Sequence, residues 1–196
     1  MAQNLVPGVS LELAQLRKIQ VKNINYKLFF SIPEKLNDEI LGVETIEFEN
    51  MDHTKDLVID FQADSSQILA VLVNSRYKIY HFSNEHIVIP FKCLKRGKNI
   101  IRIQFVAGNE SLNRFDNYLY TLFVPDKASI AFPCFDQPDL KAIFELELSI
   151  PQKWVGLSNS RIQNQVKKDG KLLVKFNRTS LISTYLFAFA AGDFNK

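Results

Sequence analysis

The stretch that decides the fold is Ala131-Phe-Pro-Cys-Phe-Asp-Gln-Pro-Asp-Leu-Lys-Ala-Ile-Phe144, which continues directly into Glu145-Leu-Glu-Leu-Ser-Ile-Pro151. Pro133 and Pro138 each fix their own φ angle and keep the preceding residue out of the helical region. We therefore expect a stiff, non-helical loop between them. After this loop, apolar and polar side chains alternate with the period of a half-buried strand. A rigid loop at the head of a strand holds its backbone groups in fixed positions, and such loops often carry function.

Two motifs of this sequence resemble one known domain. Phe132-Pro-Cys-Phe-Asp-Gln-Pro-Asp-Leu-Lys-Ala142 resembles the signature of the N-terminal domain of zinc aminopeptidases of the aminopeptidase N type, in which Glu more often stands at the position of Gln137. The stretch Ile182-Ser-Thr-Tyr-Leu-Phe-Ala-Phe-Ala-Ala-Gly-Asp-Phe194 resembles the last strand of that domain. The motifs occur in the right order and at a suitable spacing, and the resemblance runs from about Asn25 to the end of the chain.

The signature motif is expected to be structural. We expect Phe135 to pack in the core, and Asp136 and Asp139 to accept hydrogen bonds from the loop backbone, as Asp commonly does in turns. A chemical role for these two carboxylates is the alternative. The residues assigned to this structural loop are Phe132, Pro133, Cys134, Phe135, Asp136, Gln137 and Pro138.

The rest of the sequence predicts an all-β fold, an antiparallel β-sandwich or saddle of sheets with a short N-terminal helix. Strand-like patterns predict strands over residues 26–32, 40–50, 57–61, 66–73, 77–82, 87–91, 99–106, 118–124, 144–150, 171–178 and 185–191. Residues 185–191 are almost wholly apolar, which predicts a strand buried on both faces. Residues 10–19 place Leu13, Leu16 and Ile19 at helical spacing, with Ser10 as the N-cap. We therefore expect a helical extension over residues 1–20 and one β domain over residues 21–196.

Composition excludes several classes of protein. The 196 residues are 46% hydrophobic with a net charge of +3, and no Lys/Arg block suggests binding to nucleic acid. No apolar run approaches the roughly 20 residues of a membrane-spanning helix. The first residues have neither a basic region nor an apolar segment, so no signal peptide is predicted, and the compartment stays open between cytoplasmic and exported.

The cysteines and histidines give no sign of a catalytic or metal site. Cys93 and Cys134 form no C-x-x-C pair, and we expect two packed thiols rather than a disulfide or a reactive group. The sequence lacks H-E-x-x-H, and the spacing from His81 to His86 is one residue too long for the inverted H-x-x-E-H form. We expect these histidines to lie on surface turns and strands, and no metal to bind this chain.

The resemblance also implies a substrate-binding position. In similar aminopeptidases a Gln-x-Glu sequence just upstream of the signature helps to bind the N-terminal residue of the substrate. Counting back from the signature without a gap places Leu122 and Val124 at these two positions, and Ser129 where Arg is often found. Either aminopeptidase activity is weakened or the pocket is lined differently, through Tyr118 or Tyr120. The candidate substrate-binding residues are Tyr120, Leu122 and Val124.

By this resemblance, the chain is the non-catalytic N-terminal domain of a zinc-dependent aminopeptidase. Its partners would be its own catalytic domain, which is absent from this sequence and holds the zinc, and the peptide substrate. This chain itself would need no cofactor. The alternative is a free-standing β-sandwich that binds a protein or a glycan.

Overall fold

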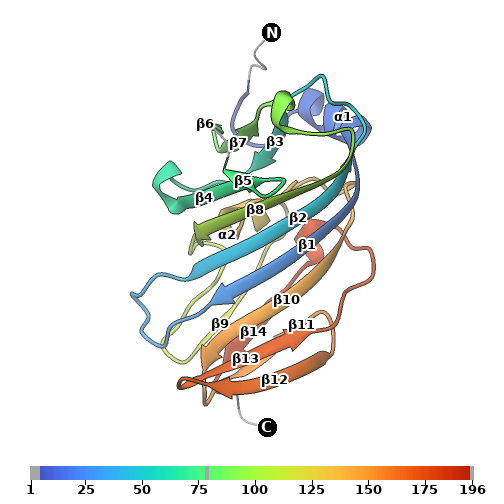
Figure 1. Cartoon of the computed structure of the whole chain (residues 1–196). Helices are drawn as coiled ribbons and strands as arrows, with labels where there is room; N and C mark the ends of the chain where they lie inside the picture. The colour runs from blue at the N-terminus through green and yellow to red at the C-terminus, as the bar shows by residue number, and fades with distance from the viewer. Residues whose placement is uncertain (1–4, 78–79, 195–196) are drawn as a thin grey trace.

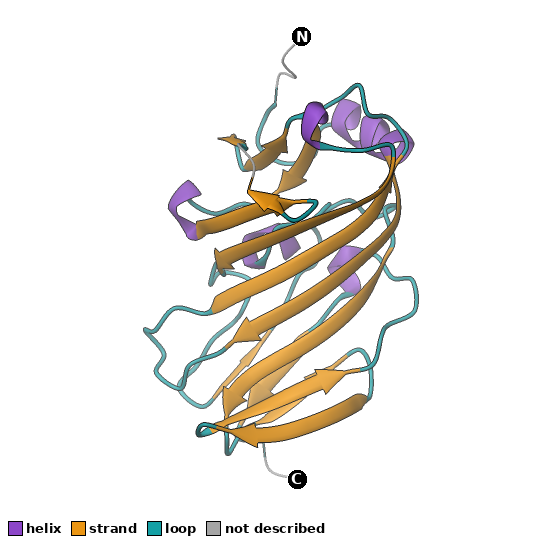
Figure 2. Cartoon of the chain, viewed as in Figure 1, coloured by secondary structure: helices purple, strands orange, loops and turns teal. Residues whose placement is uncertain are grey.

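The chain folds around one twisted eight-stranded sheet (Figures 1 and 2). The structure is a computed structural model and describes residues 5–77 and 80–194. In spatial order the strands of this large sheet are β12 (Ile162–Lys168), β13 (Lys171–Phe176), β10 (Ala142–Pro151), β1 (Val21–Ser31), β2 (Leu41–Asn50), β8 (Gly97–Val106), β4 (Ile68–Val73) and β5 (Arg76–Tyr77).

Two small sheets of three strands each accompany the large one. The first contains β11 (Val155–Ser158), β14 (Phe189–Gly192) and β9 (Tyr118–Tyr120), and the second contains β3 (Leu57–Asp60), β7 (His86–Ile89) and β6 (His81–Ser83). The helices are α1 (Leu11–Gln20), α2 (Ala128–Ala131) and the 3₁₀ turns η1 (Ser65–Gln67), η2 (Phe91–Cys93) and η3 (Thr184–Leu186). The predicted all-β class with a short N-terminal helix is confirmed. Among the described residues, no helix has the length and apolar character needed to cross a membrane.

One strand pair departs from the predicted antiparallel pattern. β1 and β2 form the expected antiparallel pair, but β10 runs parallel to β1 along its other edge, with Phe30 opposite Leu148. A parallel pair needs a long crossover connection. The residues between β1 and β10 supply it, because they build the strands β2 to β9 and the signature loop before the chain reaches the other edge of β1.

Aromatic side chains fill the space between the large sheet and the sheet of β14. Phe144 of β10 stacks on Phe187 with ring centroids 4.5 Å apart, and Phe30 of β1 lies 5.0 Å from Phe189 of β14. Phe132 meets Phe187 edge to face at 5.9 Å, so the signature motif is part of the same core. Figure 1 shows β9 and β14 behind the large sheet, which agrees with these contacts.

The predicted strand over residues 185–191 is only partly correct. Its first residues belong to η3, where Leu186 is 49% exposed, and β14 begins at Phe189. Two side-chain hydrogen bonds explain why the strand starts late. The Ser183 hydroxyl donates to the Pro138 carbonyl and the Thr184 hydroxyl donates to the Phe135 carbonyl, and these bonds turn the chain toward the signature motif.

Other strand predictions also differ from the structure. The predicted strand over 118–124 ends at Tyr120, whereas β12 and the helix α2 were not predicted. Residues 78–79 of the predicted strand over 77–82 lie outside the described residues, and so do residues 1–4 of the predicted helical extension over residues 1–20.

Helix α1 has its predicted cap, and its predicted buried face is partly correct. The Ser10 hydroxyl accepts a hydrogen bond from the Leu13 amide at 3.2 Å, which confirms the N-cap. The buried residues are Leu13, Arg17 and Gln20, whereas Ile19 is 67% exposed. Helical spacing therefore predicted the buried face only in part: Leu13 is buried as expected, but Arg17 and Gln20 complete that face and attach the helix to the domain.

Strand β2 carries an acidic residue into the core. Glu44 has the same inward orientation as Ile46 and is completely buried. Neither of its carboxyl oxygens has a hydrogen-bond partner among the described residues, and burial raises the pKa of this carboxyl well above its ordinary value. Burial therefore favours the protonated form of Glu44 in the folded chain.

Candidate functional site

Hydrogen bonds fix the signature loop, residues 132–138, to two strands of different sheets. Asp60 of β3 and Cys134 exchange two backbone hydrogen bonds, with N···O distances of 2.8 and 2.9 Å. The backbone N–H of Phe135 donates to the Tyr26 hydroxyl of β1 at 2.9 Å. The loop is thus held rigidly between the large sheet and the sheet of β3.

Burial agrees with a structural role for most of the loop. The aromatic ring of Phe135 is completely buried, and the ring of Phe48 on β2 meets it edge to face at 6.3 Å. The loop residues Phe132, Pro133, Cys134, Phe135, Asp136 and Gln137 are buried, and Pro138 is exposed.

A buried ion network lies beside the loop. The Arg17 guanidinium of α1 donates through Nη1 to Asp60 Oδ2 at 2.8 Å, and it also contacts the Asp60 carboxylate through Nη2 and the Val58 carbonyl. His86 Nδ1 lies 2.9 Å from Asp60 Oδ1. Burial alone would raise the pKa of Asp60, but Arg17, His86 and the backbone N–H of Asp136 together hold it below its ordinary value. Asp60 is therefore ionised and connects α1, β7 and the loop.

Asp136 is the loop residue with the most unusual environment. Burial raises the pKa of its carboxyl from 3.8 to about 6. The backbone N–H of Ser129, which donates to Oδ2 at 2.9 Å, opposes this increase, whereas Asp60 and Asp126 add to it. Asp136 therefore bonds to backbone as expected, and it also titrates close to neutral pH.

Gln137 connects the loop to α1. Its side-chain amide donates to the Ala14 carbonyl at 3.0 Å and to Asp139 Oδ1 at 2.7 Å. Asp139 in turn lies 3.2 Å from Lys18 Nζ. A Glu at this position has no N–H to donate, so this attachment of α1 depends on the Gln that distinguishes the sequence from the usual signature.

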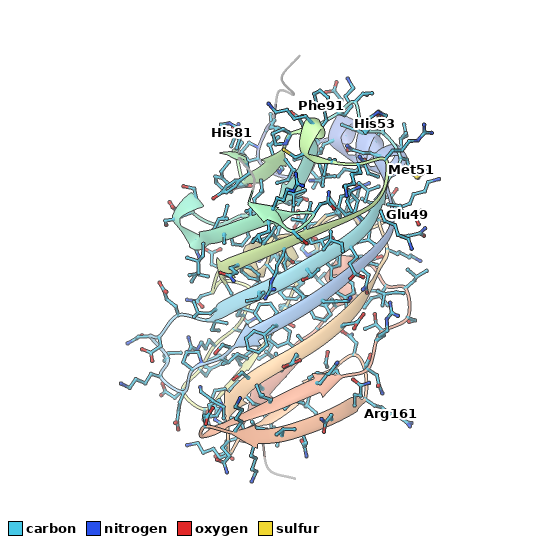
Figure 3. All side chains as sticks on the ribbon, in the orientation of Figure 1. Glu49, Met51, His53, His81, Phe91 and Arg161 are labelled. Carbon is cyan, nitrogen blue, oxygen red and sulfur yellow. The ribbon has the colours of Figure 1, made fainter. Side chains whose placement is uncertain are left out.

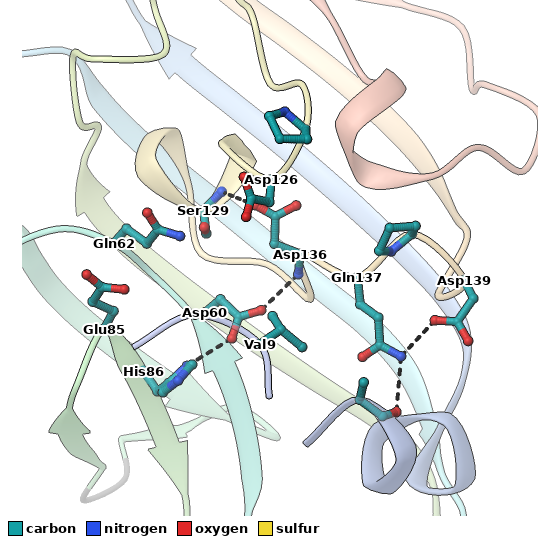
Figure 4. A pocket seen from close by; sticks show the side chains of 14 residues that line it. Val9, Asp60, Gln62, Glu85, His86, Asp126, Ser129, Asp136, Gln137 and Asp139 are labelled. Carbon is teal, nitrogen blue, oxygen red and sulfur yellow. Dashed lines mark hydrogen bonds and ion pairs between the residues drawn. The ribbon is translucent and has the colours of Figure 1, made fainter. Parts of the chain in front are cut away.

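These residues surround a pocket of about 570 Å³ (Figure 4). The first turn of α1 and the segment before it form one wall, and β3, β7 and the signature loop form the others. Its carboxylate-bearing lining residues are Asp60, Glu85, Asp126, Asp136 and Asp139, and we call it the carboxylate pocket.

The candidate substrate-binding residues lie together on the surface. We call Tyr120, Leu122 and Val124 the exposed strip; their exposed fractions are 42%, 54% and 52%. The intervening Thr121 and Phe123 are buried, so inward and outward orientations alternate even after β9 ends. Pro125, which follows through a cis peptide bond, lines the carboxylate pocket beside the strip.

Two further residues that the resemblance placed near this region lie in different settings. Ser129, at the position where related enzymes often carry Arg, is completely buried and donates its backbone N–H to Asp136. Tyr118 is half-buried and stacks on Phe115, with ring centroids 4.7 Å apart. Ser129 therefore presents no side chain to a ligand at the surface.

The histidines do not fit the zinc that the resemblance implies for the whole enzyme. His86 is buried, which corrects the expectation of a surface residue, because Asp60 faces its Nδ1 and the Val6 carbonyl lies 3.0 Å from its Nε2. Each ring nitrogen thus faces a protein oxygen. His53 and His81 are exposed and lie well apart (Figure 3). Within residues 5–77 and 80–194, no three His, Cys, Asp or Glu side chains form a group suited to a metal ion.

Both cysteines are free thiols. Cys93 is half-buried and Cys134 is completely buried, which agrees with the expected packed thiols. Burial raises the pKa of the Cys134 thiol well above its ordinary value, and so this thiol is not a nucleophile at neutral pH.

Solved structures first define the class of this domain. Over 88% of the chain, the fold matches 42% of the chain of an M1 zinc metallopeptidase from Deinococcus radiodurans, with a TM-score of 0.76 and 15% identity. A mutant of a two-domain M1 zinc metallopeptidase bound to L-arginine matches equally well, with a TM-score of 0.76 and 15% identity. At this level of identity the match shows the fold alone: a β domain of the type found in these metallopeptidases.

Sequence comparison then shows the family. The Peptidase M1 N-terminal domain model matches residues 22–186, and the chain belongs to this family. It is 33% identical over 139 residues to a probable aminopeptidase 1 of Sulfurisphaera tokodaii, covering 70% of this chain and 17% of the relative. It is 29% identical over 165 residues to an aminopeptidase N of Streptomyces lividans, covering 79% of this chain and 19% of the relative. The chain thus spans less than a fifth of the length of each of these two relatives.

Sequence reasoning missed the polar residues that organise this site. Arg17, Asp60 and His86 come from three separate segments, and no local pattern connects them. The only available signal was the position of Arg17 one turn after Leu13, on the side of the predicted helix that faces the domain.

Proposed function

We propose that this domain covers one side of the active-site chamber of an M1 aminopeptidase and takes part in recognising the N-terminus of the peptide substrate. The named relatives support this proposal, since they are aminopeptidases much longer than this chain. The zinc, the attacking water and the general base would belong to the catalytic domain of such an enzyme.

The observation that carries the proposal is the exposed strip. Tyr120, Leu122 and Val124 turn large side chains to the surface, and the resemblance places Leu122 and Val124 at the positions where similar aminopeptidases help to bind the peptide N-terminus. Neighbouring exposed apolar side chains on a soluble domain commonly mark an interaction surface. Because Leu122 and Val124 offer no hydrogen-bond acceptor, this chain would contact the first side chain of a peptide by apolar packing rather than bind its ammonium group.

A chimeric enzyme tests this proposal. The chain would replace the corresponding domain of the Sulfurisphaera tokodaii relative, and peptidase activity would be compared with that of the catalytic part alone. We expect the chimera to cleave unblocked short peptides and the isolated catalytic part to cleave them poorly. Leu122→Asp should weaken the chimera, whereas Leu69→Asp on β4 should not, although Leu69 is also 54% exposed. Equal activity of the two variants would contradict a role for the exposed strip.

A further inference from the structure

The carboxylate pocket holds more negative charge than its surroundings neutralise. Arg17 pairs with Asp60, and Lys18 pairs with Asp139. No ion pair involves Glu85, Asp126 or Asp136 among the described residues, and the residues that line the pocket include no Lys or Arg. Three carboxyl groups from three different segments therefore face one cavity without a counter-charge.

The side chain of Gln137 gives an independent indication of a ligand. It is only 4% exposed, and both of its donor contacts are made by Nε2, to Ala14 and Asp139. Its Oε1 is buried without a hydrogen-bond partner in the described part of the chain. Figure 4 shows this oxygen on the side of the amide away from Asp139. A buried acceptor is normally satisfied, so a donor is missing from this pocket.

The remaining lining suits an organic group. Val9, Ala14, Pro125 and Pro138 contribute apolar surface between the carboxylates. A volume of about 570 Å³ is typical of pockets for small molecules. A bare metal ion requires oxygen ligands gathered around one point. The described residues contain no such group, because the carboxylates are distributed around the cavity.

We propose that the carboxylate pocket binds an organic cation, an alkylammonium or guanidinium head on an apolar stem. The head donates N–H groups to Gln137 Oε1 and lies among the carboxylates of Glu85, Asp126 and Asp136, while the stem packs on the apolar lining. The same chemistry is found in a free amine or guanidine compound and in the Lys or Arg side chain of a peptide. This binding site does not depend on the function proposed for the exposed strip.

Calorimetric titration of the 196-residue chain tests this proposal, with agmatine as the free cation and N-acetyl-arginine amide as the peptide-like one. N-acetyl-citrulline amide, which has the same shape without the charge, is the neutral control. We expect one site for at least one cationic probe and no binding of the neutral probe. Binding of agmatine indicates a free cation, and binding of only the arginine amide indicates a basic side chain of a peptide.

Conservative variants show whether binding occurs in this pocket. Asp136→Asn keeps an oxygen for the Ser129 amide, and Asp126→Asn changes an exposed side chain without altering its size. Each should weaken binding about tenfold or more, since a charge-assisted contact is lost. Asp169→Asn, in the turn between β12 and β13, removes one negative charge elsewhere and should leave affinity unchanged. Circular dichroism confirms that each variant is folded.

Three outcomes would overturn the proposal. The first is that neither cationic probe binds the folded chain. The second is that the Asp136, Asp126 and Asp169 variants all bind with the affinity of the parent chain, because binding then does not involve the carboxylates of the pocket. The third is that calcium chloride binds with the same dependence on Asp136 and Asp126 while both organic probes fail, because the pocket then serves a metal ion.

Discussion

The guanidinium of Arg17 and the carboxylate of Asp60 form a completely buried ion pair that joins helix α1 to strand β3 across 43 residues of sequence. The side chain of Arg17 has no exposed surface, and its guanidinium carbon also lies 5.6 Å from the centre of the Phe135 ring. The pair therefore holds the N-terminal helix against the signature loop.

Arg17→Met should strongly destabilise the domain. It leaves the Asp60 carboxylate buried with only His86 and the Asp136 amide as partners, and breaking a buried pair in this way typically costs about 3–5 kcal/mol. Urea unfolding of the chain measures the loss. Lys18→Met on the same helix is the control, because that side chain is 70% exposed and should matter little. If both variants unfold at the same urea concentration, the pair does not support the helix.

Phe135→Ala should cost about 3–5 kcal/mol of unfolding free energy, as truncation of a buried Phe usually does. The ring lies in the core between Phe48 and Arg17, so no solvent contact compensates for the cavity. Thermal unfolding gives the measurement. Phe91→Ala is the matched control, since Phe91 is 47% exposed at the surface (Figure 3). A melting temperature of Phe135→Ala equal to that of the parent would show that the signature loop is not part of the stabilising core.

Glu44→Leu should stabilise the domain, and by more at pH 8 than at pH 5. Burial raises the pKa of Glu44 in the folded chain, so folding takes up a proton above the unfolded pKa near 4.5. Its contribution is most favourable below that value and is lost as pH rises toward the folded pKa. The advantage of Leu over Glu therefore grows with pH, by up to about 1.4 kcal/mol per pH unit.

The difference in unfolding free energy between the two chains, measured by urea from pH 5 to pH 8, checks this prediction. Because the parent and the variant share all other carboxyl groups, the pH-dependent contributions of those groups cancel in this difference. Glu49→Leu, at an outward position of the same strand, is the matched control for replacing a Glu of β2 with Leu. A difference for Glu44→Leu that stays constant with pH would mean that Glu44 is ionised in the folded chain.

Local patterns in the sequence predict much of this fold, and long-range polar contacts account for what they miss. Proline placement predicted the stiff loop, alternation predicted the hairpin of β1 and β2, and Ser10 predicted the start of α1. The parallel position of β10 depends on a crossover of the whole chain, which no local pattern encodes. Glu44 was not recognised as buried, although the alternation places it on the face of Ile46 and Phe48, because a carboxyl group is rarely buried without a partner.

The sequence likewise predicts one part of the candidate site and not the other. Leu122 and Val124 were assigned by counting residues along the chain, and both side chains are exposed, so a substrate could reach them. The carboxylate pocket could not be predicted, because its acidic residues lie on β3, before β7, after β9 and in the signature loop. Only the folded chain brings them together.

Leu122→Gln combined with Val124→Glu should improve recognition of the peptide N-terminus in the chimeric enzyme. Both side chains are more than half exposed, so polar groups can be placed there without burying them in the core. A carboxylate that meets an ammonium group in a desolvated chamber contributes about 1.5–3 kcal/mol as a charge-assisted hydrogen bond. KM for unblocked tripeptides should therefore fall by about tenfold or more.

The chimera with Leu69→Gln, which is equally exposed on β4, should keep the parent KM. Inhibition by N-acetylated tripeptides, which lack the ammonium group, should be the same for the double variant and its parent. If the double variant leaves KM for the unblocked peptides unchanged, the exposed strip does not face the peptide N-terminus and the substrate role assigned to it is wrong.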